Sequence, residues 1–162
     1  MKTKINIAVI SLLFMMACGT SDQAKEESEE KPETNKMRLK AFNNMYFVVM
    51  GDTAVIANQP DSVKAEIFER IDQGNGKWAL KTSTGKFLTD DAEKKHLVLA
   101  SKTQVGTTEQ FEIVKLERGE GSQINLKAAS GKTVCANVYI GYQMIADCEK
   151  PSTWEVLTVE YK

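Results

Sequence analysis

The 162-residue sequence contains one histidine, three cysteines and three prolines, and each scarcity excludes a class of protein. A single histidine excludes a histidine-rich metal centre, and three cysteines are too few for a disulfide-dense miniprotein. Three prolines and ten glycines are also too few for a low-complexity chain. The formal net charge of −1 offers no concentrated basic surface, so we expect no nucleic acid partner.

Residues 1–17 have the layout of a signal peptide. Lys2 and Lys4 precede a largely apolar run from Ile5 to Ala17. A permanent membrane span needs roughly 20 apolar residues, and this run is shorter. We therefore expect residues 1–17 to be removed, and we exclude them from reasoning about the fold.

The apolar run ends in MMAC, residues 15–18, which resembles the lipobox of bacterial lipoproteins. In that family the cysteine is acylated and becomes the mature N-terminus, so the resemblance implies lipid attachment at Cys18. Met15 stands where the family usually has leucine. Acyl chains anchor a protein firmly, because each buried CH₂ contributes about 0.8 kcal/mol. The alternative is a plain secretory signal followed by a chance cysteine.

Residues 18–36 should form a disordered tether. They hold six acids and three lysines but no aromatic or β-branched aliphatic side chain, so they cannot bury enough apolar surface to offset the entropy of ordering. The acids resemble the surface-export signal of Bacteroidetes lipoproteins, although residues 21–23 (SDQ) are only weakly acidic. Gly19 stands where an inner-membrane retention signal has aspartate, which favours the outer membrane, and the resemblance of the acids to the export signal favours its cell-surface face. The alternative for this segment is a solvated spacer.

Residues 37–162 contain three copies of a unit of about 42 residues. Three motifs recur in the same order: an opening Leu-Lys pair, an alanine after an aliphatic residue, and an aromatic-Glu pair. They are Leu39-Lys40, Leu80-Lys81 and Leu126-Lys127, then Ala57, Ala100 and Ala146, then Phe68-Glu69, Phe111-Glu112 and Trp154-Glu155. Each unit consists of short apolar runs between turn residues, which predicts strands. Three such units predict an all-β fold, a β-trefoil, with Phe68, Phe111 and Trp154 as core plugs.

The repeated pattern L-K-x-x-x-G-K-x-[LV], followed by an aliphatic-Ala pair and F-E-x-[IV], resembles the fascin-like (actin-cross-linking-like) β-trefoil domains. The second unit carries all of it between Leu80 and Val114, whereas the first departs at Asn44 and Met45. The resemblance covers nearly all of residues 37–162. It implies a fold rather than an activity, because the motif consists of turn and core positions. Ricin-type lectin trefoils carry a Q-x-W signature, which this sequence lacks.

Cys135 and Cys148 lie on either side of an expected hairpin turn at Gly141-Tyr142. Directly opposed positions on paired strands bring side chains close enough to bridge. An exported protein also meets an oxidising compartment, so we predict a disulfide between them. The alternative is a pair of free buried thiols.

The candidate ligand-binding side chains are aromatic. Tyr139 and Tyr142 lie at the tip of this hairpin, Trp78 opens the second unit, and residues 44–47 place two aromatic rings near a turn. Exposed aromatic rings stack on sugars or form hot spots of protein interfaces. The alternative for each is packing within the barrel.

No catalytic constellation is evident in the sequence. His96 lies in a charged segment, where we expect a solvated loop residue, and Asp90-Asp91 lack the spacing of a calcium loop. Their adjacency does not make a general acid–base pair, and neither a nucleophile elbow nor a phosphate loop is present. We therefore expect no enzyme, no metal and no cofactor.

These observations predict a monomeric binding module held to the outer membrane by its lipid anchor, with a glycan as ligand. The alternative function is that of a protein-interaction subunit, or an inhibitor, associated with an outer-membrane complex. Saccharide binding that depends on the two tyrosines would separate the first function from the second.

Overall fold

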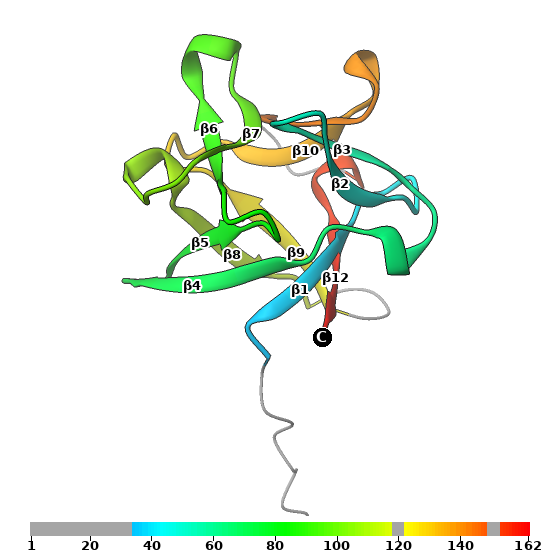
Figure 1. The fold of residues 1–162 in the computed structure, drawn as a ribbon, viewed down its shortest axis with the longest axis horizontal. Coiled ribbons are helices and arrows are strands. Elements are labelled where there is room, and N and C mark those ends of the chain that lie inside the picture. The colour runs from blue at the N-terminus through cyan, green and yellow to red at the C-terminus, as the bar shows by residue number, and fades with distance from the viewer. Residues whose placement is uncertain (1–33, 118–121, 149–152) are drawn as a thin grey trace, which may run out of the picture. The chain divides into compact units, whose positions relative to one another are not determined.

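The computed structural model describes residues 34–117, 122–148 and 153–162, and Figure 1 shows their arrangement. Each repeat contributes four strands. They are β1 (Lys36–Lys40), β2 (Tyr46–Met50), β3 (Ala54–Gln59) and β4 (Phe68–Gly74), then β5 (Lys77–Lys81), β6 (Phe87–Asp91), β7 (Leu97–Lys102) and β8 (Phe111–Lys115), then β9 (Ser122–Lys127), β10 (Thr133–Asn137), β11 (Gln143–Cys148) and β12 (Leu157–Tyr161). Short 3₁₀ turns interrupt them at η1 (Ser62–Lys64), η2 (Ala92–Lys94), η3 (Thr107–Glu109), η4 (Val138–Ile140) and η5 (Thr153–Glu155). Over the described ranges, no helix is long and apolar enough to cross a membrane.

Six of the strands close into a barrel. β1 pairs with β12, β12 with β9, β9 with β8, β8 with β5, β5 with β4, and β4 returns to β1. A closed ring leaves no free strand edge. The hairpins β2–β3, β6–β7 and β10–β11 pair with one another at the other end of the molecule and cap the barrel (Figure 1). The predicted β-trefoil is therefore confirmed.

The folded region begins slightly earlier than predicted. Lys36, expected as the last residue of the tether, is the first residue of β1. The carbonyl of Asn35 also accepts a hydrogen bond of 2.7 Å from the backbone N–H of Arg70.

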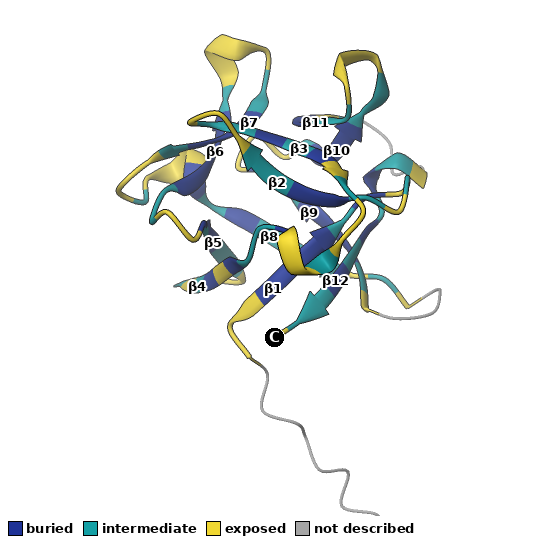
Figure 2. Ribbon diagram, turned by 45° about the vertical axis from the view of Figure 1, so that its right-hand side comes forward, coloured by how far each residue is buried: buried dark blue, intermediate teal, exposed yellow. Residues whose placement is uncertain are grey.

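The repeat motifs occupy equivalent, buried positions around the barrel axis. The opening leucines and the mid-unit alanines are fully buried in all three repeats. Each alanine N–H donates to a carbonyl in the hairpin tip of the preceding repeat: Ala57 to Tyr142 at 3.1 Å, Ala100 to Thr53 at 2.9 Å and Ala146 to His96 at 2.8 Å. Figure 2 shows buried residues along the barrel strands and exposed ones at the tips of the β6–β7 and β10–β11 hairpins.

The prediction that Trp154 is the third core plug is wrong. Phe68 lies opposite Met37 and Phe111 opposite Trp78, and the equivalent pair in the third repeat is Leu157 opposite Ile124. Leu157 is fully buried, whereas Trp154 is half-buried in η5. The plug is an aliphatic residue here, so matching the repeats by aromatic type shifts the alignment by three residues.

The predicted disulfide between Cys135 and Cys148 is present, with a Cα–Cα distance of 6.5 Å. The turn also lies where expected, because Gly141 and Tyr142 both have left-handed backbone conformations, with φ of 72° and 62°. The register differs from the prediction, since Cys148 pairs with Thr133 and Cys135 with Ile145 across a β-bulge. The disulfide therefore crosses a bulge instead of joining directly opposed positions.

Candidate functional site

Four aromatic side chains form a cluster on the surface, which we call the aromatic platform: Phe42, Tyr139, Tyr142 and Trp154. The rings of Phe42 and Trp154 are stacked, with centroids 5.9 Å apart and planes 20° apart. Tyr139 meets Trp154 edge-on at 6.1 Å, and Tyr142 lies 6.1 Å from Phe42. Such stacked and edge-to-face arrangements are favourable for aromatic pairs. The platform joins a turn of the first repeat to the hairpin tip and η5 of the third.

Local backbone chemistry fixes these rings. The turn that carries Phe42 is closed by a 3.0 Å hydrogen bond from the Asn44 N–H to the Ala41 carbonyl, and Asn44 adopts a left-handed conformation with φ of 62°. Asparagine tolerates this region because its short polar side chain bonds locally. Tyr139 lies in η4, where its N–H donates to the Asn137 side chain at 2.9 Å. These constraints hold Tyr139 away from the core, and 83% of the residue is exposed.

A groove adjoins the platform, and we call it the junction groove because β12 of the third repeat meets the end of β1 there. Its volume is about 520 Å³, within the range of small-molecule sites. Its lining residues are Ala41, Phe42, Asn44, Gln123, Thr153, Val156 and Thr158. Phe42 thus belongs to both the platform and the groove. None of these residues is ionisable, and their amides and hydroxyls can both donate and accept hydrogen bonds.

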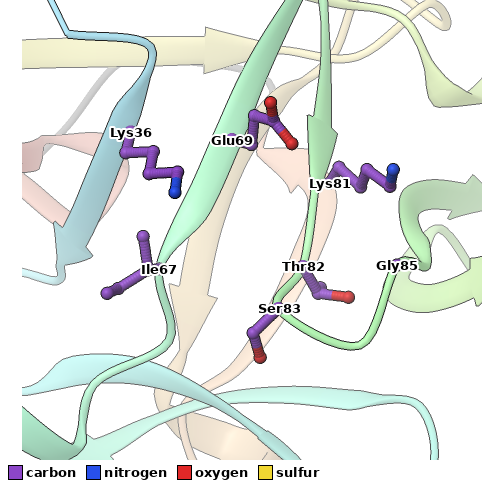
Figure 3. A pocket seen from close by; sticks show the side chains of 7 residues that line it. All are labelled: Lys36, Ile67, Glu69, Lys81, Thr82, Ser83 and Gly85. Carbon is purple, nitrogen blue, oxygen red and sulfur yellow. The ribbon is translucent and has the colours of Figure 1, made fainter.

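A second groove of about 400 Å³ lies at the next junction around the barrel, between β4 and the end of β5 (Figure 3). Its lining residues are Lys36, Ile67, Glu69, Lys81, Thr82, Ser83 and Gly85. Three of them are charged, and they come from β1, β4 and β5. None of its described lining residues is aromatic, so it offers a different surface from the junction groove.

The structure separates Trp78 from the two tyrosines with which the sequence groups it. The Arg70 guanidinium lies 5.0 Å from the Trp78 ring and 4.9 Å from the Tyr161 ring, so it stacks on both. Arg70 is buried, and Trp78 is half-buried on β5. The other aromatic candidates, Tyr46 and Phe47, are buried. Sequence reasoning missed Phe42, and it assigned Trp154 to the core.

His96 is not the solvated loop residue that the sequence predicts. Its Nδ1 lies 2.9 Å from an oxygen of Asp90, which is buried, and Ser130 Oγ donates to the other Asp90 oxygen at 2.8 Å. A serine nucleophile needs its hydroxyl bonded to the histidine. Here Ser130 instead donates to the carboxylate, so the geometry links two repeats and does not activate the serine.

Among the described residues, one group of potential metal ligands stands out: Cys135, Cys148 and Glu155, whose ligand atoms lie within 4.8 Å of one another. A metal binds the thiolate form of cysteine. Because the disulfide occupies both sulfur atoms, this group cannot coordinate a metal in the oxidised protein.

One carboxyl group close to the platform hairpin has a perturbed pKa. Lys132 donates a hydrogen bond to Asp147 on β11 and lowers the pKa of that carboxyl below its ordinary value of 3.8. Both side chains are partly exposed, so solvent weakens this pair.

A family model described as Fascin domain matches residues 26–113, more than half of the chain, and the chain belongs to this family. No curated protein matches the chain. Among solved structures it is similar to the designed threefold-symmetric protein ThreeFoil, with a TM-score of 0.65, 19% identity, and coverage of 77% of this chain and 97% of that one. It is also similar to SeviL bound to an asialo-GM1 saccharide, with a TM-score of 0.60, 11% identity, and coverage of 78% and 97%.

A third similar structure is a GlcNAcα1-4Gal-releasing endo-β-galactosidase from Clostridium perfringens, with a TM-score of 0.62 and 10% identity. This chain is covered to 79%, but only 32% of the enzyme chain is matched. At these identities the likenesses establish the β-trefoil fold alone.

Proposed function

We propose that this protein is a non-catalytic binding module that holds a glycan on the aromatic platform. The observation that carries the proposal is the convergence of Phe42 with Tyr139, Tyr142 and Trp154 on the surface, with Tyr139 largely in solvent. A folded monomer gains little by exposing such rings, so an exposed cluster marks an interaction site. Aromatic faces flanked by amides and hydroxyls suit the apolar face and the hydroxyls of a sugar ring.

Two further considerations support the proposal. SeviL, a protein of similar fold, is bound to a saccharide in its structure, so a trefoil of this size can carry a glycan site. The lipobox-like residues 15–18 would place the domain in the cell envelope by a lipid on Cys18. We propose the outer membrane, with the domain exposed at the cell surface.

A glycan array probed with the full chain in detergent tests the binding function. Saccharide binding that Tyr139→Ala and Trp154→Ala abolish supports it. Val63→Ala is the matched control, because Val63 in η1 is also an exposed apolar residue, at 80%, and lies in a different repeat. Absence of binding to every saccharide, or equal loss in the control variant, would contradict the proposal.

A second candidate function is a protein-interaction subunit or inhibitor of an outer-membrane complex. The observation that favours it is Ile140, a large aliphatic side chain that is 43% exposed beside Tyr139. Hot spots of protein interfaces are enriched in tyrosine and tryptophan, and an exposed aliphatic side chain beside them enlarges the apolar patch that a protein partner would cover. Purification from native envelope would reveal a stoichiometric partner, and retention of that partner in excess saccharide would favour this function over the first.

A further inference from the structure

The three junctions between repeats are equivalent by register, which allows their chemistry to be compared position by position. Three positions differ most: the third residue after an opening leucine, the third residue before an opening leucine, and the residue after the core plug. At the β12–β1 junction these are Phe42, Gln123 and Thr158. At the β4–β5 junction they are Ser83, Lys36 and Glu69, and at the β8–β9 junction they are Ala129, Lys77 and Glu112. One junction is therefore aromatic and neutral where the other two are small and charged.

Close to the neutral junction, Lys40 and Glu160 pair with each other. Lys40, the equivalent of Lys81, lies 3.8 Å from Glu160 and 4.6 Å from the Tyr46 ring centroid. The Tyr46 hydroxyl also bonds to Glu160. At the β8–β9 junction Lys77 pairs with Glu112 at 3.7 Å, and this pair lies on the positions that Gln123 and Thr158 occupy here.

We infer that the protein takes one neutral saccharide chain per molecule, with one sugar ring on the aromatic platform and the next sugar in the junction groove. This inference rests on the proposed function and assigns its ligand class. Gln123, Asn44, Thr153 and Thr158 offer amide and hydroxyl partners to sugar hydroxyls. None of the described lining residues offers a cation to a carboxylate or sulfate, and a charged group that enters beside them loses hydration without gaining an ion pair from them. At the charged junctions Ser83 and Ala129 stand in place of Phe42, so we expect no second site there.

Isothermal titration of the full chain tests the inference. The neutral probes are lactose, cellotriose and maltotriose, and the acidic probes are sialyllactose and trigalacturonic acid. We expect neutral saccharides to bind at a stoichiometry of one, and the acidic counterparts to bind about tenfold more weakly. A stoichiometry of three, or tighter binding of the acidic probes, would overturn the inference.

Two substitutions test the contribution of the junction groove to binding apart from that of the platform. Each installs a residue that an equivalent position in another repeat already carries. Gln123→Lys installs the residue found at positions 36 and 77, and it should raise the ratio of acidic to neutral affinity by about fivefold. Lys36→Gln, the reverse change at the charged groove, is the control and should leave binding unchanged.

The outcomes distinguish the two proposals. If Tyr139→Ala abolishes saccharide binding but Gln123→Lys changes neither the affinity nor the charge preference, the assignment of the groove is wrong and that of the platform stands. Absence of binding to all five probes and across the array overturns both.

Discussion

Removal of the disulfide should destabilise the third repeat without unfolding the barrel. Cys135 and Cys148 are 13 residues apart, and the chain-entropy relation gives about 3 kcal/mol for a loop of that length. The β10–β11 hairpin belongs to the cap, whereas the barrel strands and their fully buried leucines do not depend on the cross-link. We therefore expect Cys135→Ala/Cys148→Ala to lower the free energy of unfolding by about 3 kcal/mol and to leave a cooperative transition.

Urea denaturation of the double variant and of the wild type, with and without reductant, measures this loss. Reduced wild type is the control, because it breaks the cross-link without removing the two sulfur atoms, of which that of Cys135 belongs to a buried residue. Mass spectrometry after alkylation without reduction then reports the state of the thiols. If the free energy of unfolding falls by less than about 1 kcal/mol both in the double variant and in the reduced wild type, the chain-entropy reasoning is refuted. Alkylation of both cysteines in protein isolated from the envelope would refute the bridge itself.

Three other predictions follow from particular side chains. Leu157→Ala should lower the free energy of unfolding by about 2–5 kcal/mol and Trp154→Ala by much less, and equal losses in urea denaturation would contradict the core assignment. Because Lys132 lowers the pKa of Asp147, this pair adds stability above the unfolded-state pKa and loses it as the pH falls through the folded one. Lys132→Ala should move the Asp147 pKa, followed by NMR, back toward 3.8, and an unchanged value would exclude Lys132 as the cause. Cys18→Ser should abolish incorporation of an acyl analogue in cells, and equal labelling of variant and wild type would show that Cys18 is not the lipid site.

The trefoil was predictable from the repeated motifs alone. The opening leucines and mid-unit alanines recur once per repeat because each fills the same layer around one axis, and such layers constrain residue type at fixed spacing. The turn at Gly141-Tyr142 was also predictable, since left-handed backbone is a local requirement that glycine satisfies. The disulfide pairing followed from the same hairpin.

The positions of the aromatic rings and the charges depend on contacts between repeats, which the sequence pattern does not show. Trp154 stacks on Phe42, and no local pattern relates residues more than a hundred positions apart. His96 pairs with Asp90 because Asp90 faces inward from β6 and a hairpin tip brings the imidazole back to it. The bulge that offsets Cys135 from Cys148 arises from strand pairing at the cap. Repetition in sequence fixes the layers of the core, whereas the contacts between repeats depend on how closure of the barrel brings their loops together.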